Sequence, residues 1–172
     1  MGQQHSVTTT IEIASPPETV RAVVSPSSPF RVQYANSPQF LDWQNYKSWN
    51  DRWTLTPLEP SDRIPTDLQP GDKITADMKG TVFRPVIVEN SLAAFKWLGS
   101  LYGLFEGQHE FHWQRSQTIP GGTTMLQKED FTGPLTYFVR EGSSGGLQTK
   151  SNFESFNRDL KAEAEKRASS SA

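Results

Sequence analysis

The stretch LFEGQHEFHWQR, residues 104–115, decides the fold because two kinds of side chain alternate along it. Successive side chains of a β-strand point to opposite faces of the sheet. The odd-numbered residues form a largely aromatic face: Phe105, Gly107, His109, Phe111 and Trp113. The even-numbered residues are almost wholly polar. We therefore predict a strand whose aromatic face is buried, with the imidazole of His109 inside it.

Further strand patterns surround this stretch. β-branched and aromatic residues bounded by turn residues predict strands at 6–13, 53–57, 73–80, 81–90, 93–99 and 123–131. The sequence Pro120-Gly121-Gly122 is typical of a tight turn, so 104–115 and 123–131 are expected to pair as an antiparallel hairpin. The segments 25–40 and 59–72 are rich in Pro and polar residues and are expected to be mostly loop.

Helical patterns are fewer. Ser15 is predicted to cap a short helix that ends near Val24. Short helical turns are predicted at 38–43 and 134–140. The C-terminal region has the clearest helical pattern, because apolar residues recur there at steps of three and four. These residues are Phe153, Phe156, Leu160 and Ala164.

Length and composition restrict the possible functions. The 172 residues suit one domain, 1–172, with frayed tails at 1–5 and 168–172. Apolar residues make up 34% of the chain, and 10 Phe, 5 Trp and 4 Tyr supply much of their bulk. The net charge is −2 without any basic block. A nucleic-acid partner is therefore not expected, because phosphate binding needs clustered Lys and Arg.

Metal and cofactor sites are not expected either. The sequence has no Cys and only three His, and His109 and His112 would point to opposite faces of one strand. It also has no phosphate-binding glycine loop and no dinucleotide-binding fingerprint. We therefore predict neither a metal nor a cofactor.

The sequence gives little sign of membrane attachment. No stretch is long enough to span a bilayer, and the first residues lack the apolar core of a signal peptide, so a cytoplasmic location is expected. The opening MGQQHS matches the template for myristoylation at Gly2. One acyl chain holds a membrane only weakly, however, and no polybasic patch follows. No stable membrane association is expected.

The order of these elements predicts an α+β fold. Its main part is a curved antiparallel sheet of about six to seven strands, wrapped around a long C-terminal helix. A sheet that curls around such a helix is able to enclose a cavity.

This order, together with several local segments, resembles the helix-grip superfamily called START/SRPBCC, which includes polyketide cyclase/dehydrase, lipid-transport and birch-pollen-allergen-like proteins. The segments that carry the resemblance are 11–24, Trp49-Asn50, 85–99, 105–111, 121–133 and 156–165. Together they span nearly the whole chain. The resemblance implies a cavity under the long helix that holds an apolar small molecule.

The hairpin has a predictable register. A turn centred on residues 119–120 places His109 opposite Glu129 or Phe131. Odd residues of both strands then share the inner wall, which adds Met125, Gln127, Glu129 and Phe131 to it. The complementary face, with Glu110, His112, Lys128 and Asp130, is expected to be in water.

An imidazole and a carboxyl group inside an apolar cavity suggest acid–base chemistry. Burial raises the pKa of a carboxyl group and lowers that of an imidazole. His109 and Glu129 are therefore candidate catalytic residues for a cyclisation, dehydration or isomerisation of a polyketide- or terpenoid-like molecule without a cofactor. Gln127 is a candidate donor to a carbonyl oxygen of the substrate. The expected substrate-binding residues are Gln127, Phe95, Trp97, Phe105, Phe111, Trp113, Met125, Phe131, Phe153 and Phe156.

Other interpretations stay open. His109 and Glu129 are equally compatible with a structural polar pair, because buried polar groups are normally hydrogen-bonded without any catalytic role. The same cavity would also suit a non-catalytic carrier or sensor of a hydrophobic ligand. The acidic loop 59–72 hints at a partner-binding domain or is a plain solvated loop.

Overall fold

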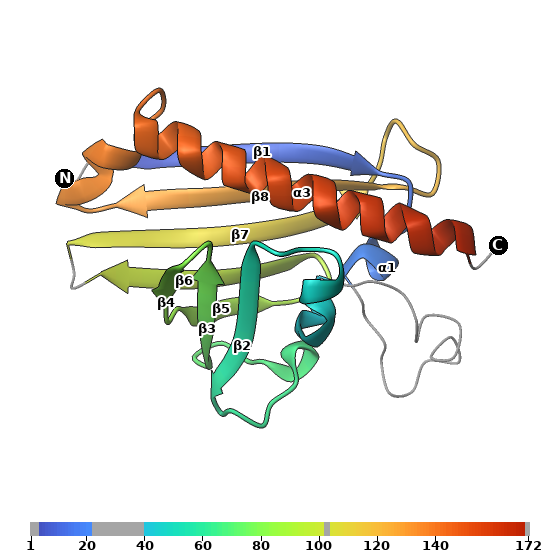
Figure 1. Ribbon diagram of the computed structural model, residues 1–172, viewed down its shortest axis with the longest axis horizontal. Helices are drawn as coiled ribbons and strands as arrows, with labels where there is room; N and C mark the ends of the chain where they lie inside the picture. Colours follow the sequence, from blue (N-terminus) through green and yellow to red (C-terminus); the bar gives the residue numbers. More distant parts are fainter. Residues whose placement is uncertain (1–3, 22–39, 102–103, 171–172) are drawn as a thin grey trace.

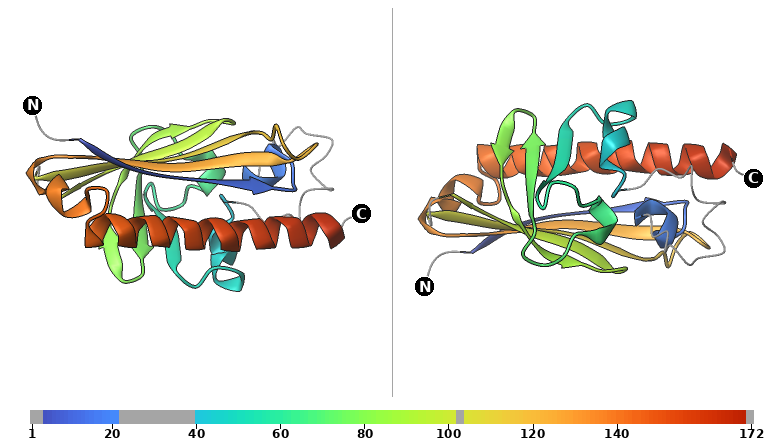
Figure 2. Two further views of the ribbon diagram at one scale, coloured as in Figure 1. Left: turned by 90° about the horizontal axis from the view of Figure 1, so that it is seen from above. Right: turned by 90° about the horizontal axis from the view of Figure 1, so that it is seen from below.

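In the computed structural model, which describes residues 4–21, 40–101 and 104–170, one antiparallel sheet curls over a long C-terminal helix. The strands follow the order β1-β8-β7-β6-β5-β3-β2, and the short strand β4 branches off by pairing with β3. Figure 1 shows the helix α3 running along β1 and β8, and the two views in Figure 2 place it on one face of the sheet. The predicted α+β helix-grip architecture is confirmed.

The described elements have the following bounds. The strands are β1 (His5–Ile13), β2 (Trp53–Glu59), β3 (Lys73–Met78), β4 (Thr81–Phe83), β5 (Val86–Asn90), β6 (Ala94–Leu101), β7 (Phe105–Arg115) and β8 (Thr123–Thr132). The helices are α1 (Pro17–Arg21), η1 (Trp43–Ser48), η2 (Pro65–Asp67), η3 (Pro134–Val139) and α3 (Ser144–Ser170), where η marks a 3₁₀ helix.

The central hairpin has the predicted register. His109 on β7 lies directly opposite Glu129 on β8. Across the other side of β7, His109 faces Trp97 on β6. Because side chains alternate between the faces, this register places every odd-numbered residue of β7 and β8 on the side of α3.

Aromatic rings fill the space between the sheet and α3. Phe156 of α3 stacks on Trp53 of β2, with ring centres 4.2 Å apart and planes 16° apart. It also contacts Phe111 of β7 and Tyr46 of η1, with centre distances of 6.1 and 6.0 Å. The four apolar residues that predicted the helix are all buried on this side: Phe153, Phe156, Leu160 and Ala164. Helix and sheet are thus joined by interlocking rings.

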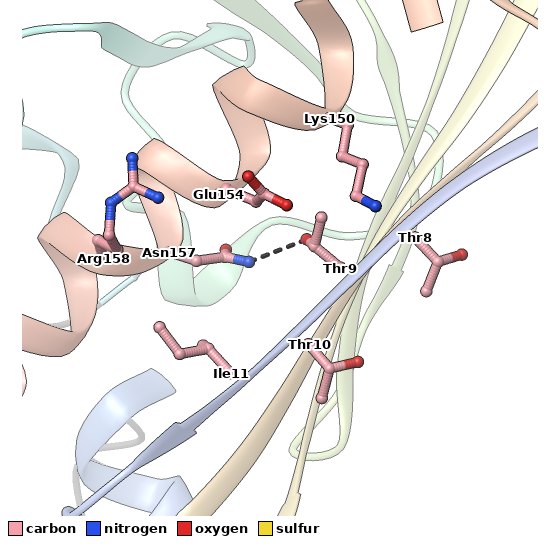
Figure 3. Close-up of a pocket in the computed structure, with 8 residues that line it drawn as sticks. All are labelled: Thr8, Thr9, Thr10, Ile11, Lys150, Glu154, Asn157 and Arg158. Carbon is pink, nitrogen blue, oxygen red and sulfur yellow. Dashed lines mark hydrogen bonds between the residues drawn. The ribbon is translucent and has the colours of Figure 1, made fainter. Parts of the chain in front are cut away.

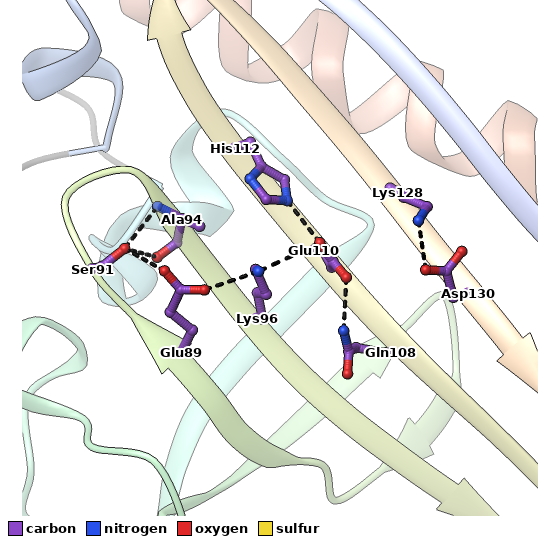
Figure 4. A network of polar contacts seen from close by, with 9 residues as sticks. All are labelled: Glu89, Ser91, Ala94, Lys96, Gln108, Glu110, His112, Lys128 and Asp130. Carbon is purple, nitrogen blue, oxygen red and sulfur yellow. Dashed lines mark hydrogen bonds and ion pairs between the residues drawn. The ribbon is translucent and has the colours of Figure 1, made fainter.

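The outer face of the sheet carries a polar network, as the alternation predicts (Figure 4). The Glu110 carboxylate accepts hydrogen bonds of 2.7 Å from His112 Nε2 and from Gln108 Nε2. Lys96 Nζ lies 2.9 Å from Glu89 and 3.7 Å from Glu110. Glu110 is nevertheless only 9% exposed, because these neighbours cover it. The prediction of a freely solvated face is therefore wrong for Glu110.

Several predicted boundaries need correction. The expected strand 81–90 is divided into β4 and β5, because Pro85 has no N–H for a continuous ladder. Ser15 does not cap α1: its hydroxyl is buried without a partner, and the first amides of the helix bond to the carbonyl of Pro16. The expected end of this helix, near Val24, lies outside the described residues.

The predicted helical turn at 38–43 begins outside the described residues, and the 3₁₀ helix η1 starts at Trp43, the last residue of that turn. Two elements extend into the segments that were predicted to be tails, 1–5 and 168–172. His5 already belongs to β1, and α3 continues to Ser170. In the described part of the chain, no helix is both long enough and apolar enough to cross a membrane.

Replacing Phe156 with Ala should lower the free energy of unfolding by about 3–5 kcal/mol, because the ring is fully buried and contacts rings from the sheet and from η1. Urea unfolding followed by tryptophan fluorescence measures this loss. Leu147→Ala is the matched control, since Leu147 lies on the same helix but is 59% exposed; its effect should stay within about 0.5 kcal/mol. Equal losses in the two variants would contradict the ring-centred core.

Candidate functional site

His109 lies in the middle of the aromatic core. Its side chain is fully buried and stacks on Phe111 with ring centres 4.6 Å apart. Phe153 of α3 and Trp97 of β6 pack against it at 4.7 and 4.8 Å, and Trp53 of β2 meets it edge-on at 5.7 Å. These rings separate the imidazole from any ligand outside the core.

Both nitrogens of His109 face polar groups of β8. The Gln127 amide nitrogen Nε2 donates a hydrogen bond of 2.8 Å to His109 Nε2. The ring proton is then on Nδ1, which points toward Glu129 Oε2 at 3.6 Å. That distance exceeds a hydrogen bond, and Nδ1 has no hydrogen-bonding partner. Glu129 therefore stands beside His109 without being tied to it.

Burial makes both members of this pair neutral at pH 7. Desolvation lowers the pKa of His109 to about 3. Desolvation also raises the pKa of Glu129 to about 8, with a smaller contribution from the nearby negative charge of Asp130. The gap of 3.6 Å agrees with an uncharged pair, because a charge-assisted hydrogen bond would draw the two groups closer. Glu129 is consequently a carboxylic acid that is able to donate a proton.

Two glycines give the Glu129 carboxyl group its space. Gly99 of β6 lies opposite Gly107 of β7, so two adjacent positions of the inner face carry no side chain. A Cβ atom built on Gly107 would stand 2.6 Å from Glu129 Oε1, whereas one on Gly99 would meet nothing closer than 3.7 Å. The carboxyl group therefore leans over Gly107, which is the kind of close approach that glycine within a strand permits.

The carboxyl group lines a pocket of about 260 Å³ between β4 and the ends of β6, β7 and β8. Its lining consists of Thr81, Val82, Phe83, Gly99, Ser100, Phe105, Gly107 and Glu129. The Glu129 side chain is 16% exposed there, whereas His109 behind it is not exposed at all. We call this the Glu129 pocket.

The structure separates the predicted site residues into two groups. Only Glu129 and Phe105 reach the Glu129 pocket. The others are core residues that are 4% exposed or less: His109, Gln127, Phe95, Trp97, Phe111, Trp113, Met125, Phe131, Phe153 and Phe156. The expected position of the ligand under α3 needs correction, because their rings occupy that space. The pocket lies instead at one end of the sheet.

Six residues of this pocket were not predicted from the sequence. They are Thr81, Val82, Phe83, Gly99, Ser100 and Gly107. One signal was available, because Gly107 interrupts the aromatic face of 104–115 where a large side chain would otherwise stand. The contribution of β4 could not be foreseen, since that strand was expected to continue into β5.

A second pocket lies between α3 and the free edge of β1 (Figure 3). It has a volume of about 390 Å³ and is lined by Thr8, Thr9, Thr10, Ile11, Lys150, Glu154, Asn157 and Arg158. Asn157 Nδ2 donates to Thr9 Oγ1 at 2.9 Å across it. This groove is polar and contains none of the predicted site residues.

No arrangement of three or more His, Asp or Glu side chains suited to a metal ion occurs within 4–21, 40–101 and 104–170. Among the described residues, the candidate site is therefore an apolar pocket whose lining contains one acid, Glu129.

Comparison with known proteins identifies the fold. Neither a family profile nor a curated protein matches the sequence. Among solved structures, the hypothetical protein jhp0584 from Helicobacter pylori matches with a TM-score of 0.64 at 12% identity, over 93% of this chain and 88% of that one. Norcoclaurine synthase from Thalictrum flavum, in complex with dopamine and hydroxybenzaldehyde, has a TM-score of 0.58 at 7% identity, over 94% and 86%.

The di-domain ARO/CYC StfQ from the steffimycin biosynthetic pathway matches with a TM-score of 0.61 at 11% identity. The match covers 96% of this chain but 52% of StfQ, so the chain spans about half of that protein. These neighbours show that the chain has the START/SRPBCC fold, as its sequence resemblance implied.

The raised pKa of Glu129 predicts a pH dependence of stability. Between its ordinary value of 4.5 and about 8, the unfolded chain has lost the proton that the folded chain retains. Glu129 therefore makes the free energy of unfolding fall as pH rises, by at most about 1.4 kcal/mol per pH unit. Glu129→Gln removes this contribution, so its stability relative to the wild type should increase steadily in urea unfolding at pH 5.5, 6.5 and 7.5.

Glu106→Gln is the control, because Glu106 is an exposed carboxyl group on neighbouring β7. Its stability should run parallel to that of the wild type across the same pH range. A Glu129→Gln curve that also runs parallel would show that the Glu129 carboxyl is ionised in the folded protein.

Proposed function

We propose that the chain binds an apolar, oxygenated small molecule of the polyketide or terpenoid class in the Glu129 pocket. We further propose that Glu129 promotes its cyclisation, dehydration or isomerisation by acid–base chemistry without a cofactor. One observation supports this function: a carboxyl group that burial keeps protonated faces a pocket with apolar walls. Such a combination of a perturbed acid and a concave apolar surface is typical of an active site.

A protonated carboxyl group in this position has a defined chemical use. It donates its proton to a carbonyl oxygen of the ligand, which favours loss of a proton from the neighbouring carbon as the enol forms. The resulting Glu129 carboxylate is then the base that accepts that proton. In a dehydration, the same acid protonates the departing hydroxyl group, which leaves as water, and the resulting carboxylate accepts a proton from the adjacent carbon as the double bond forms. The pKa near 8 suits both directions, since an acid–base group works best when its pKa lies close to the working pH.

His109 does not contact the substrate in this proposal, because its imidazole is enclosed by rings and does not touch the pocket. It lies beside Glu129 without a hydrogen bond to it, so we assign it no catalytic role. Gln127 holds it from the other side. Instead of the predicted proton transfer by both His109 and Glu129, this proposal has one acid, Glu129, with a buried imidazole beside it.

Proteins with the same fold lend support from their own ligands. Norcoclaurine synthase was crystallised with dopamine and hydroxybenzaldehyde, both aromatic oxygenated molecules, and StfQ comes from the steffimycin biosynthetic pathway. At identities of 7–11% these parallels concern the class of ligand and not its identity.

A second candidate function is a non-catalytic carrier of such a ligand. The burial of the other predicted polar groups favours it. His109 does not reach the pocket, and the Gln127 amide is hydrogen-bonded to His109 within the core, so neither is free to act on a substrate. In a carrier, Glu129 would donate a hydrogen bond that orients the ligand.

Glu129→Gln distinguishes the two functions. Native mass spectrometry of the purified protein identifies the co-purifying molecule, and that molecule or its precursor then serves for binding and turnover assays. If Glu129 is the acid, the variant should lose at least about 100-fold in kcat while Kd changes by less than about threefold, because Gln preserves shape and hydrogen bonding but has no acidic proton. A parallel loss of binding and turnover would favour the carrier.

Gly99→Leu tests the position of the pocket itself. A leucine side chain on Gly99 would extend toward Phe83 and occupy the space beside Gly107, so the ligand should no longer co-purify or bind. Gly99→Ala is the matched control, because its Cβ meets only ordinary contacts at 3.7 Å and beyond. If the Gly99→Leu variant bound the ligand as tightly as the wild type, the binding site would have to lie elsewhere in the protein.

A further inference from the structure

Arg21 is a buried positive charge without a negative partner. It is the last residue of α1, and only 5% of it is exposed. Burying a charge away from water costs several kcal/mol unless an opposite charge and hydrogen bonds compensate it. This residue takes no part in the function proposed above, so its burial needs its own explanation.

The hydrogen bond to Asn90 does not supply the missing charge. Arg21 Nη2 donates to Asn90 Oδ1 at 2.5 Å. The amide nitrogen of Asn90 is in turn held by the carbonyl groups of Pro65, Thr66 and Leu68 at 2.9–3.3 Å. Asn90 is thus a neutral acceptor that is fixed in place by the loop around η2. It orients the guanidinium group but leaves its charge uncompensated.

No carboxylate takes that role. Arg21 forms no ion pair with any residue of the described ranges. Burial lowers the pKa of Arg21 to about 10, and no acidic group raises it again. The stretch 22–39, which follows Arg21 and lies outside the described residues, contains no Asp and no Glu in its sequence. Glu18, in the first turn of α1, is exposed and forms no ion pair with Arg21, so it does not supply the missing counter-charge.

A second orphan donor lies beside Arg21. The guanidinium carbon is 5.7 Å from the centre of the Trp113 ring on β7, and the indole Nε1 of Trp113 is buried without a hydrogen-bond partner. Arg21 Nε is likewise buried without a partner. Both groups are donors only, since neither an indole N–H nor a guanidinium accepts a hydrogen bond. Two buried donors without partners, close to an uncompensated positive charge, are groups that an anionic acceptor would satisfy.

We infer that Arg21 and Trp113 form a binding site for a small oxyanion, a carboxylate or a phosphate group. One oxygen of the anion would accept from Arg21 Nε, and the same or a second oxygen would accept from Trp113 Nε1. Guanidinium groups match such anions in charge and in geometry. Asn90 serves as the positioning residue that holds the guanidinium toward the anion.

This anion site is separate from the Glu129 pocket. Trp113 and Gly107 lie six positions apart on β7, which corresponds to roughly 20 Å along an extended strand. Figure 1 shows α1 at the end of β7 away from the tip of β6, where the pocket lies. Failure of one proposal therefore leaves the other untouched.

Thermal unfolding in the presence of simple anions tests the site. The wild-type chain is titrated with inorganic phosphate or with acetate in place of chloride at constant ionic strength and pH. The melting temperature should rise saturably with the anion that fits, and the comparison of the two anions distinguishes a phosphate site from a carboxylate site. Arg21→Gln should weaken the apparent affinity at least about tenfold, because a charge-assisted contact is lost.

Arg158→Gln is the matched control, since Arg158 is an exposed arginine on α3 that donates to Ser155 and, among the described residues, has no hydrogen bond or ring contact with Arg21 or Trp113. It should respond to the anions like the wild type, which accounts for the general stabilisation of folded proteins by phosphate. An equal response of wild type, Arg21→Gln and Arg158→Gln would overturn the inference.

Trp113→Phe provides an independent measurement that does not depend on removing the charge. Phenylalanine keeps an aromatic ring under the guanidinium group but has no N–H, so the anion affinity should fall severalfold while the response remains saturable. An unchanged affinity would remove Trp113 from the site. Should Arg21→Gln fail to fold, the absence of any saturable response in the wild type would overturn the proposal by itself.

Discussion

The enclosure of an imidazole by aromatic rings is the interaction on which the rest of this structure depends. His109 fills a position where an apolar residue would pack without cost, so its two nitrogens must be accommodated within the core. Gln127 satisfies one nitrogen directly, and Glu129 faces the other. Burial lowers the pKa of His109 and raises the pKa of Glu129, so a neutral imidazole lies beside a protonated carboxyl group. The acid is the only one of the two with access to solvent, through the space over Gly107.

Much of the fold was predictable from the sequence because its signals are local and strong. The alternation in β7 fixed which face is buried, and the short turn after it fixed that His109 pairs with Glu129. The spacing of Phe153, Phe156 and Leu160 identified the helical face that closes the core. The resemblance to START/SRPBCC proteins pointed to the same architecture, and the similarity to solved structures agrees with it.

The site was predictable only in part. Glu129 was identified because the odd-numbered residues of its strand share the inner face of the sheet. The expectation of a hollow interior was wrong for the region under α3, where buried rings fill the space. The alternation of side chains along a strand predicts which of them point inward, but not whether their volumes leave a cavity. The Glu129 pocket depends on a break at Pro85, which allows β4 to form one wall, and on two glycines that face each other across β6 and β7. Contacts between residues that are far apart in the sequence leave no periodic pattern in it, so they could not be predicted.

The glycine pair has a consequence for how this protein changes over generations. Most of the buried rings that hold the chain together do not line the Glu129 pocket, although Phe83 and Phe105 line it and also pack against the core. Variation at Gly99 or at the exposed Val82 would alter the shape of this pocket while leaving the stacked aromatics in place, and so at little cost to folding. Gly107 is the exception, because any larger residue there displaces the acid itself. Selection is therefore expected to hold this one position fixed for as long as the acid is in use.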